Sequence, residues 1–398
     1  MDSGSIAWLL TASALVLLMT PGLAFFYGGL VRSRNVISTI MLSFMSMAVV
    51  SVVWVLWGYS IAFGEGSAIV GDLSLLGLSG VEPGDDMLFA VFQMMFAIIT
   101  PALITGAMVE RFKFTTYLVF LVVWVTLVYA PIAHWVWAGN GWLFDLGALD
   151  FAGGTVVHIN AAMAAVAAAL LVGKRRDPGL EPGNVPYVVI GAALLWFGWF
   201  GFNAGSGLAA DGVAINAFLV TNTAAATAAL TWGILSQIQN KRMSAAGVAT
   251  GAVGGLVAIT PAAGAVGVMG ALAIGFGAGV FCYLAVLIRP RLGVDDALDV
   301  FAVHGIGGIW GALATGIFTV SVFTDGVKGL VEGNIEQLGI QAVGVVATMA
   351  YSFIASLIIL KVLDLIPGLG LRVSERDEGT GLDVAAHGER AYVSDGAD

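Results

Sequence analysis

The feature that most constrains this chain is a series of apolar runs, each about 20 residues long, that follow one another almost from end to end. A helix rises about 1.5 Å per residue, so about 20 residues cross the roughly 30 Å hydrocarbon core of a bilayer. We count eleven such runs, centred on residues 6–30, 37–62, 87–108, 115–134, 151–172, 186–206, 215–236, 245–261, 267–288, 300–319 and 337–361. The sequence therefore predicts an all-α polytopic membrane protein with eleven transmembrane helices.

Composition supports the same class of protein. Only 11% of the 398 residues are charged, against about 25% in soluble domains, and the 54 glycines suit close helix packing in lipid. The single cysteine, Cys282, lies in an apolar run, which argues against a disulfide framework and against a cysteine metal site. No feature indicates a nucleic-acid partner. The first residues lack a basic region and a clear cleavage site, so we expect a first spanning helix rather than a signal peptide.

Basic residues predict the orientation, because cytoplasmic loops carry an excess of lysine and arginine. With eleven helices, only Lys328 of the 16 basic residues falls on the opposite side from the others. The other basic residues follow alternate helices: Arg32, Arg34, Arg111, Lys113, Lys174, Arg175, Arg176, Lys241, Arg242, Arg289, Arg291, Lys361, Arg372, Arg376 and Arg390. We therefore expect the N-terminus outside and the C-terminus in the cytoplasm.

An odd number of helices also suggests a repeat. Five helices precede the loop near residue 180 and five follow it, so halves spanning about 6–172 and 186–319 would have opposite topology. We predict a 5+5 inverted repeat plus a final helix at 337–361, with a site near the midplane where the halves meet. The polar segment after about residue 371 holds three arginines and seven acidic residues, a composition that predicts disorder.

Two histidines lie inside the apolar runs at matched positions of the two halves. His158 follows Asp150 by eight residues, and His304 follows Asp296 by eight residues. Eight residues are about 12 Å of helix, so the two histidines approach the midplane from opposite faces and could meet there. Ionisable residues within a membrane indicate function by default. Interhelical hydrogen bonding and a bis-histidine haem are the alternatives.

The aspartates have a simpler explanation available. Asp150 precedes its helix, where Asp is a favoured N-cap and suits the helix dipole. Inversion places Asp150 outside and Asp296 inside, so only Asp150 could also attract an incoming cation. We expect a set of three acids to cap the helix at 300–319 and to offset Arg289 and Arg291: Asp295, Asp296 and Asp299.

Aromatic residues gather near the predicted outer helix ends. They comprise Phe92, Phe96, Trp135, Trp137, Trp142, Trp196, Trp199 and Phe202, with Ser206 beside them. Interfacial aromatic belts are common in membrane proteins and explain many such side chains. Aromatic faces with a hydroxyl could also receive a small cation through cation–π attraction.

Six segments together resemble the ammonium transporter (Amt/Mep/Rh) family over essentially the whole chain. They are FFYGGLVRSRN, ITGAMVERFKF, DFAGGTVVHINAA, GWFGFNAGS, DDALDVFAVHGIGGIWG and GLDVAAHGERAY, in that order. Ser206 and the last segment favour the Amt branch. The resemblance implies a membrane domain over residues 1–370 and a cytoplasmic regulatory tail over 371–398, packed on the cytoplasmic face.

The resemblance also implies a role for each of several residues. Trp137, Phe96 and Ser206 look like the outer ammonium recruitment site, and Phe96 and Phe202 look like the stacked gate beneath it. His158 and His304 look like the twin histidines that line the narrow pore. Asp150 looks like the essential aspartate close to the recruitment site. The family further implies a homotrimer with one pore in each subunit and a PII-type regulatory protein as partner.

Charge then decides the expected mechanism. Transferring an ion into an apolar medium costs about 20 kcal/mol in the idealised case, whereas deprotonating an amine with a pKa of about 10.4 costs about 4–5 kcal/mol at neutral pH. We therefore expect ammonium, or its analogue methylammonium, to be deprotonated outside and ammonia to cross the plasma membrane. Whether the proton also crosses is left open.

We expect a transporter without a cofactor or a metal, not an enzyme. The alternative function is an ammonium sensor. No kinase or cyclase sequence follows the tail, so a sensor is expected to act through the PII-type partner.

Overall fold

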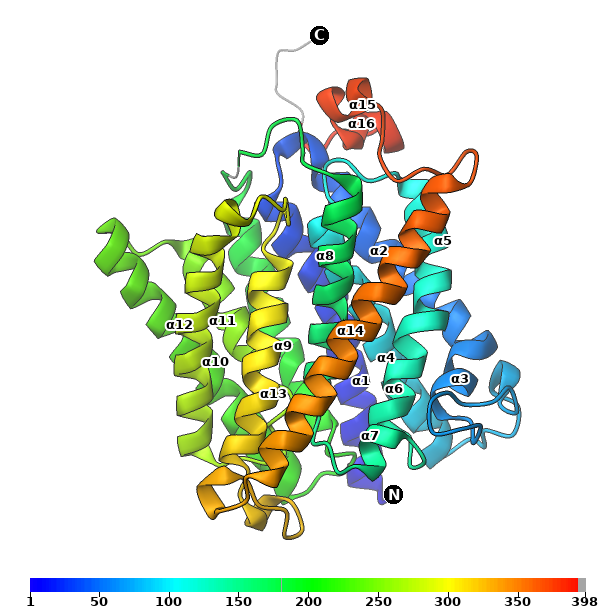
Figure 1. The fold of residues 1–398 in the computed structure, drawn as a ribbon, viewed down its shortest axis with the longest axis vertical. Coiled ribbons are helices and arrows are strands. Elements are labelled where there is room, and N and C mark those ends of the chain that lie inside the picture. The colour runs from blue at the N-terminus through cyan, green and yellow to red at the C-terminus, as the bar shows by residue number, and fades with distance from the viewer. Residues whose placement is uncertain (180, 393–398) are drawn as a thin grey trace.

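The computed structural model describes residues 1–179 and 181–392, and these are almost entirely helical (Figure 1). The single antiparallel bridge within them joins Phe112 to Arg372. Ten segments of the described residues are long and apolar enough to cross a membrane. Five of them are single helices: Ser3–Leu30 (α1), Val185–Gly205 (α9), Gly212–Asn240 (α10), Val268–Leu292 (α12) and Glu336–Leu365 (α14). The other five contain shorter helices: Ser33–Phe63 contains α2 (Val36–Val53) and α3 (Tyr59–Phe63); Asp85–Ala107 contains α4 (Asp85–Ile104); Phe114–Asp145 contains α5 (Phe114–Trp124), α6 (Ala130–Trp137) and α7 (Trp142–Asp145); Gly154–Val172 contains α8 (Asn160–Val172); and Phe301–Phe318 contains α13 (Ile306–Phe318).

The remaining predicted run, at 245–261, forms a shorter helix. Helix α11 covers Ala245–Ile259, and its 15 residues extend only about 22 Å. Pro261 helps to end it, because a proline has no backbone N–H to donate to the preceding turn. A buried turn follows, in which a Cβ on Gly264 would overlap the Phe151 ring. Ten predicted runs therefore match candidate spans, and the eleventh is too short to cross by length alone.

The first helices of the two predicted halves, α1 and α9, lie along one another with very close backbones. A Cβ on Gly191 would stand 2.2 Å from the backbone nitrogen of Phe26, so only glycine fits there. Small residues allow this approach in lipid, where packing rather than burial from water holds helices together.

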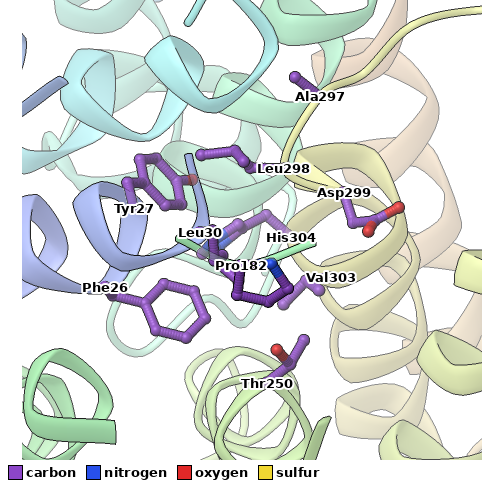
Figure 2. A pocket seen from close by; sticks show the side chains of 10 residues that line it. All are labelled: Phe26, Tyr27, Leu30, Pro182, Thr250, Ala297, Leu298, Asp299, Val303 and His304. Atoms are coloured by element: carbon purple, nitrogen blue, oxygen red, sulfur yellow. The ribbon is translucent and has the colours of Figure 1, made fainter. Parts of the chain in front are cut away.

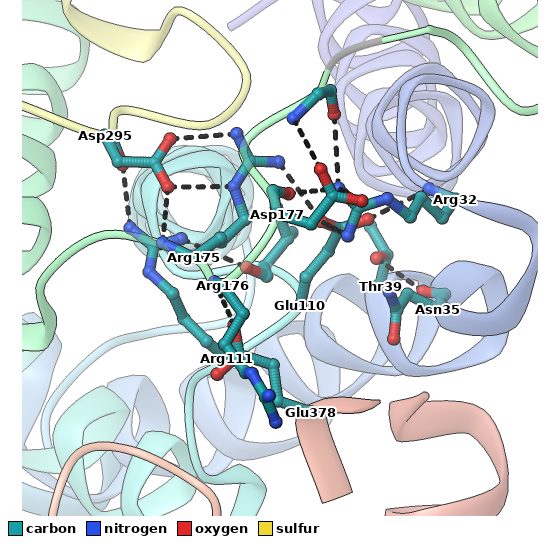
Figure 3. A network of polar contacts seen from close by, with 12 residues as sticks. Arg32, Asn35, Thr39, Glu110, Arg111, Arg175, Arg176, Asp177, Asp295 and Glu378 are labelled. Atoms are coloured by element: carbon teal, nitrogen blue, oxygen red, sulfur yellow. Dashed lines mark hydrogen bonds and ion pairs between the residues drawn. The ribbon is translucent and has the colours of Figure 1, made fainter. Parts of the chain in front are cut away.

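Four of the loops predicted to share one side of the membrane meet in one network of polar contacts (Figure 3). Arg175 donates to Asp295 at 2.8 Å and to Glu110 at 3.1 Å, and Arg32 pairs with Glu110 at 3.4 Å. These residues follow α1, α4, α8 and α12. The prediction that Asp295 offsets Arg289 and Arg291 is wrong, because Asp295 binds Arg175 instead. Burial alone would raise the pKa of Asp295, yet the hydrogen bonds from Arg175 hold it at about 2.

Residues 371–392 fold against these loops, contrary to what composition alone predicts; residues 393–398 of the predicted tail lie outside the described residues. They include two short helices, α15 (Glu375–Thr380) and α16 (Leu382–His387), which lie at the top of Figure 1, opposite the N-terminus. Asp383 accepts from the Ser38 backbone N–H at 2.8 Å, and Asn35 accepts from the Leu382 N–H at 2.8 Å. Such specific polar contacts with the loops hold a segment that has too few apolar side chains to form a core of its own.

Candidate functional site

Five rings from five different elements form a continuous column through the bundle. In order they are Trp137 of α6, Phe96 of α4, Phe202 of α9, His158 and His304. The distances between successive ring centroids are 5.7, 4.3, 6.0 and 5.3 Å. Trp137 is partly buried and the other four are buried. The structure therefore brings together both predicted histidines and three of the predicted aromatic residues.

The two histidines contact each other directly. Their Nδ1 atoms lie 3.2 Å apart, which is a hydrogen bond with one nitrogen as donor and the other as acceptor. When both rings are neutral, the ring that donates through Nδ1 has a bare Nε2, and the other ring carries its proton on Nε2. The pair thus offers one donor and one acceptor besides its own hydrogen bond.

Both histidines lie on π-helical turns, a feature that the sequence pattern did not reveal. His158 belongs to Gly154–Ile159 (η6) and His304 to Phe301–Gly305 (η7). Such turns are rare and occur frequently at functional sites, since the extra residue alters where each side chain points. The matched positions in the two halves therefore share backbone geometry as well as residue type.

An aspartate caps each of these turns. Asp150 Oδ1 accepts from the Gly153 N–H at 2.9 Å, and Oδ2 accepts from the N–H groups of Thr155 at 2.8 Å and Val156 at 3.2 Å. The Asp296 carboxylate likewise accepts from the Phe301 N–H at 2.7 Å. The capping interpretation of both aspartates is confirmed.

Asp150 also connects its turn to the head of the ring column. Its carbonyl oxygen accepts from Trp137 Nε1 at 2.8 Å. Because Asp150 is 8% exposed and its carboxylate already accepts several N–H groups, any attraction for a cation would act through its charge rather than through direct contact. That electrostatic role stays a prediction.

A very small cavity lies where the column reaches the histidines. It has a volume of about 10 Å³, and His158, His304, Trp199 and Phe202 line it together with aliphatic side chains. That volume holds roughly one water-sized molecule and is far too small for a haem between the histidines. His158 Nε2 is buried there without a hydrogen-bond partner among the described residues.

A larger cavity of about 110 Å³ also borders His304 (Figure 2). Phe26 and Tyr27 of α1 face it from one side, and Leu298, Asp299 and His304 from the other. Burial raises the pKa of Asp299 to about 7, against the opposing effect of its ion pair with Arg289. His304 is therefore shared between a cavity for one small molecule and a wider, more polar space.

Trp199 lies beside the ring column, whereas the sequence left open whether it belongs to an interfacial belt or to a cation site. It is 2% exposed, stacks on His158 at 5.4 Å between centroids, and donates through Nε1 to Thr260 Oγ1 at 2.8 Å. Its position three residues before Phe202, on the same helix face, was the signal that could have identified it.

The outer tryptophans divide into two groups. Trp137 packs edge-on against Phe96, whereas Trp135 packs on Trp142 and on Tyr351. Ser206 contacts the backbone of one column residue, because its hydroxyl donates to the Phe202 carbonyl at 2.8 Å.

The sequence pattern assigned no role to His134, which lies outside the ring column. Both of its ring nitrogens contact backbone carbonyls, Ala62 O at 2.9 Å and Ser67 O at 2.6 Å. It thereby ties α6, which carries Trp137, to the loop that follows α3.

Comparison with known proteins gives one consistent answer. The model of the Ammonium Transporter Family matches residues 7–392. The chain is 49% identical to the ammonium transporter Amt1 of Archaeoglobus fulgidus, with 99% of this chain and 100% of the relative covered, and 49% identical to the ammonium transporter of Bacillus subtilis, with 98% and 99% covered.

Solved structures agree with the family match. Saccharomyces cerevisiae Mep2 superimposes with a TM-score of 0.89 at 38% identity, covering 95% of this chain and 89% of that one. A protein described as a sensor Amt protein superimposes with a TM-score of 0.89 at 32% identity, covering 96% and 98%.

The cap on η6 gives a direct stability prediction. In Asp150→Asn, an NH₂ group replaces one carboxylate oxygen and faces backbone N–H donors, each of which loses its acceptor at a cost of about 1–3 kcal/mol. We expect a clearly lower midpoint of thermal unfolding for the detergent-solubilised protein. Thr155→Ala, which removes one hydroxyl donor and leaves both carboxylate oxygens in place, is the matched control and should change the midpoint less. Equal midpoints for Asp150→Asn and wild type would contradict the capping role.

Proposed function

The chain belongs to the ammonium transporter family, and from this premise we propose that it recruits and deprotonates ammonium outside the plasma membrane and conducts ammonia through the column. The observation that carries this proposal is the narrowing of the ring column to a cavity of about 10 Å³ between Phe202 and the histidine pair. Such a space admits one small molecule and gives it hydrogen bonds from imidazole nitrogens, but offers no water shell.

Recruitment uses the outer end of the column. Trp137, Phe96 and Ser206 form the site for the cation, since aromatic faces attract cations by about 0.5–2 kcal/mol depending on solvation. The Asp150 carboxylate adds a negative charge beneath this site. Phe96 and Phe202, 4.3 Å apart between centroids, act as the gate, and both are buried.

Deprotonation occurs before the narrow cavity, because moving the positive charge of ammonium into that apolar space costs free energy. Transferring an ion into an apolar medium costs about 20 kcal/mol in the idealised case, whereas removing the proton from an amine costs about 4–5 kcal/mol at neutral pH. Neutral ammonia both donates and accepts hydrogen bonds, which matches the one donor and one acceptor that the His158–His304 pair provides. Beyond His304 it enters the 110 Å³ cavity, which is large enough to hold water molecules.

The proton has a separate route open to it. A proton relayed through the imidazole pair would reach His304, and Asp299 faces the same inner cavity with a pKa near neutrality. Imidazoles are suited to such a relay near pH 7.

We propose a matching topology for the whole chain. It has the N-terminus outside, eleven helices arranged as a 5+5 inverted repeat plus a final helix, a membrane domain over residues 1–370, a cytoplasmic tail over 371–398, and three subunits with one pore each. The opposite positions of the N-terminus and α15–α16, and the meeting of four of the basic loops in one polar network, support the orientation.

The recruitment site can be tested by methylammonium uptake in cells that lack other ammonium transporters. Trp137→Leu removes the cation–π face, so we expect KM to rise roughly 2- to 30-fold, with a smaller change in maximal rate. Trp142→Leu is the matched control, because Trp142 lies at the same mouth but packs on Trp135, and it should leave KM near that of wild type. An unchanged KM in Trp137→Leu, or an equal rise in both variants, would argue against this site.

A sensing function is the second candidate, and the docked tail favours it. The tail contacts the loops at the end of the bundle where the inner cavity lies, so a protein that bound there could respond to the state of the pore. One structural neighbour is itself described as a sensor. The partner proposed for this chain is a PII-type regulatory protein that plugs the pores.

Pull-down of the purified full-length chain with a PII protein, with and without ATP and 2-oxoglutarate, tests this partner. We expect binding that depends on these ligands and that is lost when residues 371–398 are deleted. Methylammonium uptake by the deletion variant serves as the control for folding. Undiminished binding by a deletion variant that still transports would rule out the tail as the docking element.

A further inference from the structure

The narrow cavity beside the histidine pair has the Trp199 ring as one of its walls. This ring lines the cavity of about 10 Å³, stacks on the His158 ring at 5.4 Å between centroids, and lies 5.4 Å from the Phe202 ring. A cavity of this volume holds about one water-sized molecule. Ammonia is of that size, whereas methylamine carries one more carbon atom, so methylamine passes only if a wall of the cavity moves.

The backbone that carries Trp199 packs too closely on α1 to yield. On α9, Gly198 and Gly201 lie on either side of Trp199 in the sequence, and both face the α1 backbone. A Cβ on Gly198 would stand 2.6 Å from the Leu15 carbonyl oxygen, and a Cβ on Gly201 would stand 2.7 Å from the Ala12 carbonyl oxygen. Close-packed interiors resist displacement. Any movement of this wall must therefore come from the indole side chain.

The hydroxyl of Thr260 holds that side chain in place. Trp199 Nε1 donates to Thr260 Oγ1 at 2.8 Å, and the same hydroxyl donates to the Leu256 carbonyl at 2.8 Å, which orients it as an acceptor. Thr260 is fully buried. A buried indole N–H needs an acceptor, and this hydroxyl is the one that the described residues supply. The ring is therefore tied at its polar end.

The segment that carries Thr260 also supports the histidine side of the cavity. Pro261 follows it, and the Pro261 carbonyl accepts from the Phe151 N–H at 3.2 Å. Pro261 also packs so closely on Gly154 that a Cβ there would stand 2.6 Å from the Pro261 Cβ. Gly154 begins the π-helical turn that carries His158. One short segment thus positions two walls of the cavity, the indole through a hydrogen bond and the histidine turn through packing.

We propose that the Thr260 hydroxyl sets the selectivity of the pore for ammonia over methylamine, by fixing the Trp199 ring against the His158 ring. This inference rests on the proposed function and adds a specificity-determining step to it. The step acts on the neutral amine at the inner cavity, whereas the Trp137 site acts on the cation before the gate. Thr260 is a positioning residue, because it acts through the indole.

The test is the ratio of the maximal transport rates of ammonium and methylammonium. Both rates are measured on full-length protein in vesicles, from the pH change or current above that of protein-free vesicles. Wild type should favour ammonium by at least about 10-fold, since one extra methylene in a fitted pocket changes rates by about 10–200-fold. Trp199→Leu enlarges the cavity and should lower this ratio by roughly 5-fold or more. Thr260→Val keeps the side-chain shape but leaves the indole N–H without its acceptor, and should lower the ratio by about 2- to 5-fold.

Two matched variants separate this role from a structural one. Thr260→Ser keeps the hydroxyl and should keep the wild-type ratio. Thr315→Val should also keep it: Thr315 is another fully buried threonine that donates to a carbonyl one turn earlier, Gly311 O at 2.9 Å, but it accepts no indole N–H from the residues that the structure describes. In Thr260→Val the KM for each substrate should stay near that of wild type, because the Trp137 end of the column is unchanged.

Equal losses of both rates in Thr260→Val, with the ratio unchanged, would show a structural role only and overturn the proposal. The same drop in ratio in Thr315→Val would overturn it as well. A wild type that transports neither substrate contradicts the proposed function, on which this inference rests. A wild type that transports both, together with a full ratio in Thr260→Val, contradicts this inference alone.

Discussion

The hydrogen bond between His158 and His304 is the interaction on which the rest of this structure depends. Two imidazole rings from opposite halves of the chain meet at 3.2 Å between Nδ1 atoms, within the helix bundle. To bring them there, each half begins its helix with an aspartate that caps a π-helical turn, and a glycine clears the way: a Cβ on Gly308 would stand 3.3 Å from the His158 Cβ. The aromatic column ends on this pair and both inner cavities touch it.

The placement of charge follows from that arrangement. In the proposed function, the indole and phenyl rings at the Trp137 end of the column hold a cation that remains partly hydrated. At the histidines, roughly one small molecule fits, so the protein can replace hydration with a few hydrogen bonds but cannot compensate a full charge. The change from one environment to the other occurs across Phe96 and Phe202. At the tail end, ionic contacts of Arg175 with Glu110 and Asp295 join loops from both halves, so the geometry of the two capped turns is supported by a buried polar network.

Much of this could be predicted from the sequence, because hydrophobic length and the spacing of charged residues are strong signals in a membrane protein. Ten of the apolar runs match the candidate spans, and the two Asp-to-His spacings placed the histidines at depths where they do meet. Other features depend on three-dimensional packing. The length of α11 is set by Pro261 and a buried turn, and the π-helical turns arise from a backbone choice that residue types do not encode. Asp295 lay beside Arg289 and Arg291 in the sequence, yet it binds Arg175 from another loop. The sequence left Trp199 open between an interfacial belt and a cation site, whereas in the structure its ring stacks on His158.

The central claim is that the histidine-lined cavity passes a neutral molecule rather than an intact cation. Potassium ion tests it most directly, since it is a monovalent cation close in size to ammonium but has no proton to lose. Purified protein in a solid-supported membrane should be given matched gradients of ammonium and of potassium, with transported charge and vesicle pH recorded together. The account predicts an ammonium-dependent signal, as a pH change, a current or both, and no potassium current above that of protein-free vesicles. A potassium current comparable to the ammonium response would show that the pore carries whole cations, and would contradict the account.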